Sequence, residues 1–218
     1  MSAPSSNPGA RSRRTRPTDV AGMLALDLAR ALAVTQGHAR CARQDLPVEE
    51  HVREDLDRVI RASRRAALMA GLLRFLALPP RPRCERLDLS AVLADVQLGL
   101  CALRRGCEPA LDLDCALPPI VADRGLLELL VPTLLLSRPR PEPLSPLFVS
   151  TARVVEVPAP PHAELVVRGA LASGAGCRSS RAERFRDLAE RIAAWCGIPL
   201  EVRRDEGFLV QRCRFEIA

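Results

Sequence analysis

Two long amphipathic segments that follow one another directly constrain the fold of this chain more than any other feature. Pro17-Thr18-Asp19 is a plausible helix start, and apolar residues then recur at helical spacing to about Gln44. Asp45-Leu46-Pro47 interrupts this pattern, and a second apolar stripe runs from Val52 to about Leu78. Because the break between the segments is short, they predict two long helices joined as an antiparallel hairpin.

The apolar face of each predicted helix is wider than a single partner helix can cover. In the first helix it comprises Val20, Leu24, Leu28, Ala31, Leu32 and Thr35. In the second it comprises Val52, Leu56, Val59, Ile60, Ser63, Ala67, Ala70 and Leu73. We therefore expect the hairpin to pair with a second copy of the chain, so that four helices form one bundle and the protein is a homodimer.

A proline-rich stretch at 78–84 ends the second helix and predicts a stiff linker to a second domain. Beyond it we expect helices at 90–105, 124–136 and 180–196, and strands at 86–89, 109–113, 147–157, 163–168, 200–204 and 208–217. This pattern predicts an α+β fold, in which the hairpin precedes an α/β sandwich with helices on one face of a mixed sheet. The predicted parts are an arginine-rich tail at 1–17 that we expect to be disordered, the hairpin at 18–79 and the α/β domain at 86–218.

The composition fits a folded protein without a membrane-spanning segment. Of 218 residues, 48% are apolar and 27% are charged, so the chain can bury a proper core. The most apolar stretch, 126–136, contains Glu128 and Pro132 and is far shorter than the roughly 20 residues that cross a bilayer. Because no apolar leader stands at the N-terminus, we expect a cytoplasmic protein.

Cysteine, histidine and aspartate do not combine into a metal site or a catalytic set. The eight cysteines form no CxxC pair and have no histidine at metal spacing, so we interpret them as small and mostly buried apolar residues. The alternation at Asp112 and Asp114 indicates a solvated strand face, and Asp123 is typical of a helix cap. His51 near the hairpin turn and His162 in a loop are interpreted as surface residues. We expect no metal and no cofactor.

The order of the predicted elements, together with residues at several of their joints, resembles the catalytic core of bacterial sensor histidine kinases. In that family a dimerisation and phosphotransfer hairpin precedes an ATPase domain of the Bergerat type. The stretches that carry the resemblance are 53–66, 87–93, 117–128 and 190–202. The resemblance covers about residues 19–218 and implies the two-part fold predicted above.

Where the resemblance places the phosphate acceptor, this chain has no histidine. In the family the acceptor lies in a pattern like Gly-x-x-Ala-His-Asp on the first helix. Here Gly22, Ala25 and Asp27 match, and Leu26 stands at the histidine position. Leucine has no nucleophilic nitrogen, so autophosphorylation at this position is chemically excluded, and Asp27 has no histidine to orient.

The residues that the resemblance assigns to ATP are also replaced. Thr133 and Ser137 occupy the positions of the asparagines that hold magnesium and phosphate oxygens, and we expect Pro132 to disturb that helix. Residues 166–172, which include Gly169 and are expected to follow the corresponding strand, contain no carboxylate that reads the adenine amino group.

Residues 181–186 replace the glycine-rich turn that, in the family, brings backbone N–H groups to the phosphates at the start of the last helix. Glu183 would repel phosphate there, and Phe185 would crowd it. Together with the other replacements, this predicts a closed or filled pocket, no ATP binding and no enzymatic activity.

These expectations lead to the hypothesis of a non-catalytic signalling protein, a homodimeric relative of histidine kinases in shape only. It would bind a response regulator, a kinase or another regulatory partner, because a groove between bundle helices can receive a partner's helix. The expected contact surface consists of Asp27, Arg30, Val34, Met69, Leu73 and Leu76.

Two alternatives stay open at this point. One is a histidine phosphotransferase in a phosphorelay, for which His38 on the first helix is the candidate acceptor. The other is a DNA-associated regulator, whose arm with Arg11, Arg13, Arg14 and Arg16 would contact nucleic-acid phosphates. A solvated tail is the simpler interpretation of this charge run.

Overall fold

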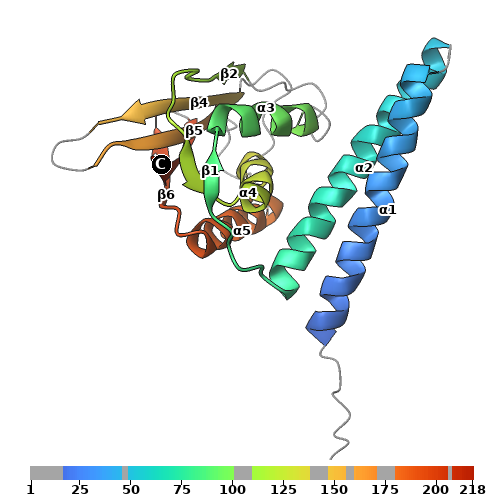
Figure 1. The fold of residues 1–218 in the computed structure, drawn as a ribbon, viewed down its shortest axis with the longest axis horizontal. Helices are drawn as coiled ribbons and strands as arrows, with labels where there is room; N and C mark the ends of the chain where they lie inside the picture. The colour runs from blue at the N-terminus through green and yellow to red at the C-terminus, as the bar shows by residue number, and fades with distance from the viewer. Residues whose placement is uncertain are drawn as a thin grey trace, which may run out of the picture.

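Two long helices form the N-terminal part of the structure, as predicted. The computed structural model describes residues 17–45, 49–100, 110–137, 147–155, 160–170, 180–205 and 208–218. Helix α1 spans Pro17–Asp45 and helix α2 spans Glu50–Ala77, and they run side by side in opposite directions (Figure 1). Residues 46–48, which include Pro47 of the predicted break, and the tail at 1–16 lie outside the described residues.

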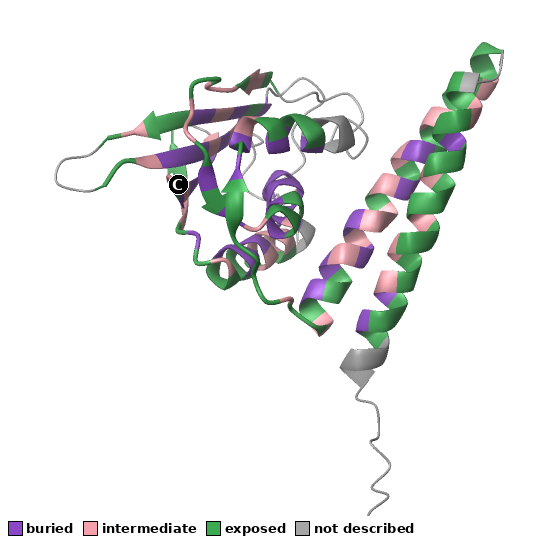
Figure 2. Ribbon diagram, viewed as in Figure 1, coloured by how far each residue is buried: buried purple, intermediate pink, exposed green. Residues whose placement is uncertain are grey.

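Small side chains allow the two helices of the hairpin to pack closely. Ala25 and Ala39 of α1 are buried, as are Ser63 and Ala70 of α2. The guanidinium Nε of Arg43 lies 3.2 Å from a carboxylate oxygen of Asp57, which joins α1 to α2 toward the turn. Figure 2 shows that the outer side of α1 is mostly exposed, so this helix buries little beyond its contact with α2.

Part of the apolar face of α2 is covered by the chain's own α/β domain. Leu68, Leu72 and Phe75 belong to the same buried cluster as the core of that domain. At Gly71, a Cβ atom would come within 2.8 Å of a methyl group of Leu129, so glycine permits the close approach of the neighbouring helix. A second copy of the chain is therefore not needed to cover this part of α2.

The linker after α2 is tied to the α/β domain at its far end. The backbone N–H of Arg83 donates a hydrogen bond to Oδ2 of Asp123 at 2.6 Å. Strand β1 (Glu85–Leu87) then pairs antiparallel with β3 (Ile120–Ala122) in a two-stranded sheet. We did not predict β3, because three residues directly after two prolines carry too little alternation to indicate a strand.

The remaining strands form one mixed sheet, which confirms the predicted architecture. They are β2 (Ala110–Asp112), β4 (Leu147–Val154), β5 (His162–Ala170), β6 (Leu200–Asp205) and β7 (Phe208–Glu216). Their order is β2-β4-β5-β7-β6, in which β2 runs parallel to β4 and the other pairs are antiparallel.

Three helices lie between this sheet and the hairpin (Figure 1): α3 (Leu89–Leu100), α4 (Arg124–Leu136) and α5 (Ser180–Trp195). The expected continuation of α3 to residue 105 falls in 101–109, outside the described residues. Gly197, with a φ of 68°, ends α5 in the left-handed conformation, and the N–H of Ile198 donates to the carbonyl of Ala193 at 2.9 Å. Gly197 thus turns the chain from α5 toward the hairpin of β6 and β7.

Candidate functional site

Helix α4 carries the positions that the sequence resemblance assigns to magnesium and phosphate. Asp123 caps it, since its Oδ1 accepts a hydrogen bond from the N–H of Leu126 at 2.9 Å. Pro132 lies within α4, yet the helix is continuous, so the predicted disturbance is wrong. A proline inside a helix costs about 3 kcal/mol, because one backbone hydrogen bond is lost and the ring clashes with the preceding turn. Burial of a single leucine contributes about 1.5–3 kcal/mol, and α4 buries five of them, which offsets the proline.

Thr133 and Ser137 are both fully buried and contribute to the core instead of lining a ligand site. The Thr133 hydroxyl donates to the carbonyl of Leu129 at 2.6 Å, and the Ser137 hydroxyl donates to the carbonyl of Leu134 at 2.6 Å. The Ser137 oxygen also accepts a hydrogen bond from Nε2 of Gln211 at 2.9 Å. Both hydroxyls are therefore engaged within the protein.

Gln211 is a residue whose role the sequence analysis missed. It lies in the middle of β7 and is fully buried, and its Oε1 has no hydrogen-bond partner within the described part of the chain. The available signal was a polar residue at an inward position, because Leu209, Cys213 and Phe215 alternate with it toward the core. Gln211 links β7 to Ser137 at the end of α4.

Gly169 is buried inside β5, where it pairs with Leu147 of β4 and with Leu209 of β7. We expected residues 166–172 to follow the strand. This is wrong for 166–170, because the ladder with β7 extends β5 to Ala170. The stretch that follows the strand, 171–179, lies outside the described residues.

Glu183 and Phe185 lie near the start of α5, and both are half-buried. Phe185 packs against the hydrophobic core. Glu183 is in the first turn, where a carboxylate interacts favourably with the positive end of the helix dipole. Glu183 thus places a carboxylate in the first turn of α5, next to Arg184.

The acceptor position on α1 has an apolar side chain in an ordinary helical setting. Leu26 is half-buried next to the buried Ala25. Asp27 is exposed, and its Oδ1 lies 3.5 Å from Nη1 of Arg30, which is also exposed. Exposed pairs of this kind add little to stability, and both groups are available to solvent.

The three histidines lie on three different elements. His38 is exposed on α1. His51 is exposed on α2, with its Nδ1 3.2 Å from a carboxylate oxygen of Glu49. His162 is half-buried and is the first residue of β5, so the predicted loop position is wrong, because the strand pairing with Glu216 and Val154 includes it.

The residues predicted to form the partner surface come from both helices of the hairpin, and all of them except the half-buried Met69 are exposed. Val34, Leu73 and Leu76 have exposed fractions of 59%, 57% and 42%. Met69 and Leu76 of α2 line a cavity shared with α5, and none of the predicted α1 residues lines it.

A second cavity, of about 660 Å³, lies between the hairpin and helices α3 and α4, and Arg40 and Arg64 contribute to its lining. Within it, Arg124 donates from Nη2 to Asp95 at 2.7 Å and from Nε to Glu128 at 3.0 Å. The hydrogen bond and the charge of Glu128, followed by those of Asp95, raise the pKa of Arg124. Both carboxylates on this wall are thus engaged by an arginine.

Trp195 connects the linker, α2 and α5. Its Nε1 donates to the carbonyl of Pro80 at 2.7 Å, and its ring meets Phe75 edge-on with 6.5 Å between centroids. Trp195 is 45% exposed, because it sits at the junction between the hairpin and the α/β domain.

The described cysteines divide into two groups. Cys41, Cys84 and Cys115 are exposed, contrary to the expected burial, whereas Cys196 is half-buried and Cys213 is buried. Burial raises the pKa of the Cys213 thiol, and of Cys196, to about 12, so both stay protonated at neutral pH. Cys101, Cys107 and Cys177 lie outside the described residues.

In the described ranges no three His, Cys, Asp or Glu residues are grouped to hold a metal ion. No helix in these ranges is long and apolar enough to cross a membrane.

The chain is similar to known proteins in its structure, whereas the sequence comparisons find no match. No protein-family profile and no curated protein matches the chain. Full-length ShkA, solved in complex with AMPPNP, is similar with a TM-score of 0.53 and 15% identity, over 92% of this chain and 46% of ShkA. The chain thus spans less than half of ShkA.

Two further solved structures are similar to a lower degree. They are the Acinetobacter baumannii histidine kinase AdeS and the cytoplasmic segment of the histidine kinase QseC. AdeS has a TM-score of 0.49 and 13% identity, over 86% of this chain and 96% of AdeS. QseC has a TM-score of 0.48 and 18% identity, over 71% of this chain and 94% of the QseC segment.

Proposed function

We propose that this chain, whose fold is that of a histidine kinase core, is a non-enzymatic protein of two-component signalling that acts by binding other proteins. The observation that carries the proposal is the burial of Thr133 and Ser137. Both are 0% exposed at the positions where the sequence resemblance expects magnesium and phosphate ligands. In this proposal the chain is cytoplasmic and keeps the kinase shape as a binding scaffold.

A magnesium–nucleotide complex would have to disrupt the core to reach these positions. Oxygen ligands of Mg²⁺ lie about 2.1 Å from the ion, so a hydroxyl must face open space to contribute. The hydroxyls of Thr133 and Ser137 instead donate to backbone carbonyls of their own helix. Their exposure would break these bonds and would leave Gln211 Nε2 without its acceptor.

Introducing a histidine at the acceptor position tests whether the chain lacks only the acceptor or also the nucleotide site. Leu26→His places a nucleophilic nitrogen next to Asp27 at a half-buried position of α1. We expect no acid-labile label on this variant after incubation with radiolabelled ATP and magnesium. Label on Leu26→His but not on the wild-type chain would mean that ATP is bound, and would contradict the proposal.

Homodimerisation is part of the proposal and rests on apolar side chains that the single chain leaves uncovered. On α1, Leu24 and Leu28 are 64% and 48% exposed and lie one turn apart. On α2, Val59 and Leu73 are also exposed, at 41% and 57%. Such residues on a helical hairpin are typically buried by a second hairpin in a four-helix bundle. Light scattering at micromolar concentration should give the mass of a dimer, and a monomer mass would refute this part.

A phosphotransferase that uses His38 is the second candidate, because His38 is exposed on the helix that would carry an acceptor. Its test is incubation with a phosphorylated response regulator. Acid-labile label that is lost in His38→Gln supports phosphotransfer, and a wild-type chain without label removes this candidate. The predicted DNA-binding arm lies in residues 1–16, outside the described residues.

A further inference from the structure

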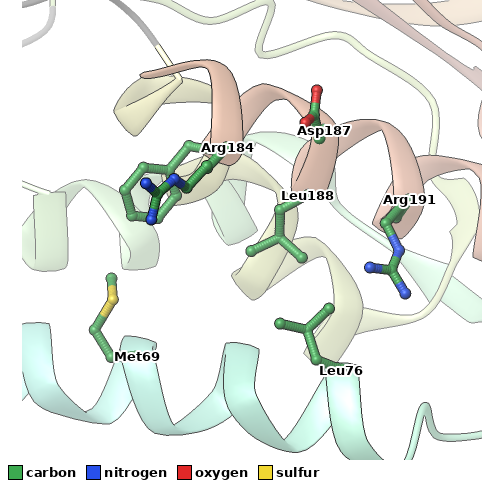
Figure 3. Close-up of a pocket in the computed structure, with 7 residues that line it drawn as sticks. Met69, Leu76, Arg184, Asp187, Leu188 and Arg191 are labelled. Atoms are coloured by element: carbon green, nitrogen blue, oxygen red, sulfur yellow. The ribbon is translucent and has the colours of Figure 1, made fainter. Parts of the chain in front are cut away.

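A groove of about 660 Å³ lies between α2 and α5 (Figure 3). Four of its lining residues are apolar: Met69 and Leu76 come from α2, and Phe185 and Leu188 come from α5. None of the four is fully buried, and Leu76 is 42% exposed, so the chain does not complete the packing of this surface by itself.

The charged side chains of the groove are arranged so that positive charge faces inward. In Figure 3, Arg184 and Arg191 extend toward the space between the helices, with Leu188 between them, whereas Asp187 points away from α2. Within the described part of the chain, neither arginine forms an ion pair or a hydrogen bond with a carboxylate. The two guanidinium groups therefore offer donors to an acidic partner.

The spacing of these residues matches the repeat of a helix. Arg184 and Arg191 are seven residues apart on α5, and Met69 and Leu76 are seven residues apart on α2. Seven residues make two helical turns and span about 10.5 Å. A third helix that lies in the groove can therefore meet both arginines with side chains two turns apart on one flank, and both apolar residues with its apolar face.

We infer that this groove docks an amphipathic helix of another protein, with leucine-like residues on one face and two acidic residues seven positions apart beside them. The inference rests on the proposed function, in which the chain acts by binding proteins, and it names the partner's chemistry. The groove contains Met69 and Leu76 of the predicted contact surface and adds residues of α5 to them.

The chain itself supplies no such helix from its undescribed segments. Residues 1–16 contain four arginines and no acidic residue, and 171–179 also contain no acidic residue. The segments 101–109, 138–146 and 156–159 each contain a single glutamate and at least one proline. Charge complementarity therefore favours an acidic segment from a different protein over these parts of the chain.

The test uses the full chain and a synthetic helical peptide of about 14 residues, with leucines at i, i+3, i+4 and i+7 and two glutamates seven positions apart. Its control is the same peptide with lysines in place of both glutamates. We expect the glutamate peptide to bind, measured by fluorescence anisotropy, and the lysine peptide not to bind. Equal binding of the two peptides, or no binding of either, overturns the inference.

Two protein variants locate the binding. Arg184→Glu/Arg191→Glu should weaken binding of the glutamate peptide about tenfold or more, because the charge at both inward positions is reversed. Arg203→Glu/Arg204→Glu makes the same charge change on exposed positions of β6 and should bind as the wild type does. The milder Arg184→Gln/Arg191→Gln pair should reproduce the weakening if the double reversal fails to fold.

The outcomes separate this inference from the proposed function. If the groove is covered by a second copy of the chain, the Arg184→Glu/Arg191→Glu variant becomes monomeric in light scattering, and the inference is wrong. Unchanged peptide affinity in this variant also overturns it. Neither result bears on ATP binding, whose detection would instead contradict the proposed function and leave the groove intact.

Discussion

Replacement of Ser137 and Gln211 measures how firmly the position expected for a magnesium ligand is built into the core. Gln211 is fully buried and donates from Nε2 to Ser137 at 2.9 Å. In Ser137→Ala this amide N–H has no acceptor in apolar surroundings, which costs about 1–3 kcal/mol of the free energy of unfolding.

Gln211→Leu should behave differently, because it removes donor and unpartnered acceptor together. The Oε1 atom of Gln211 is buried without a hydrogen-bond partner in the described structure, so its loss relieves a desolvation cost. The Ser137 hydroxyl keeps its own acceptor, the carbonyl of Leu134. We expect Gln211→Leu to change the free energy of unfolding by no more than about 1 kcal/mol, toward greater stability.

The double variant supplies the decisive comparison. With Leu at 211 no amide is left unpaired, so Ser137→Ala should then cost only the hydroxyl–carbonyl bond, about 0.5–1 kcal/mol. The coupling energy between the two positions should be about 1–2 kcal/mol. Urea unfolding followed by far-UV circular dichroism resolves this, since 1 kcal/mol moves the midpoint by about 0.5 M. Additive effects, or a Ser137→Ala cost below about 0.5 kcal/mol, would refute the reasoning.

Three further predictions concern the core, the linker and the dimer. Burial raises the pKa of Cys213 to about 12 from 9.0. Above pH 9 the unfolded chain therefore releases a proton that the folded chain keeps. The stability that Cys213 contributes is complete below pH 9 and should fall by about 1.4 kcal/mol per pH unit toward pH 12, so Cys213→Val should reduce the pH slope of the free energy of unfolding in alkaline urea titrations. Trp195→Phe removes the hydrogen bond to Pro80 and should speed trypsin cleavage in the linker. An unchanged cleavage rate would show that this bond does not hold the linker in place. Leu24→Arg/Leu28→Arg should yield a folded monomer in light scattering, and a persistent dimer would place the interface elsewhere.

The elements that sequence predicts well are those whose pattern repeats over many residues. The stripes of α1 and α2 continue for several turns, and Asp123 before a run of leucines indicates the start of α4. The alternation in β5 and β7 predicts strands for the same reason, and their pairing follows from the expected fold.

The features that sequence reasoning missed depend on contacts between distant residues. The proline in α4 is tolerated only because the helix is buried on nearly all sides. The bond between Gln211 and Ser137 joins residues that are 74 positions apart. Likewise, the face shared by Met69 and Phe185 exists only once α2 and α5 have packed. No local period encodes such pairs.

The central claim, that the nucleotide position is filled by core side chains, is tested most directly by thermal unfolding in the presence of ATP and magnesium. A ligand at 100 times its dissociation constant adds about 2.7 kcal/mol to stability, which shifts the midpoint of a chain of this size by several degrees. We predict no shift of the melting temperature at millimolar ATP. A saturable rise that depends on magnesium would contradict the account.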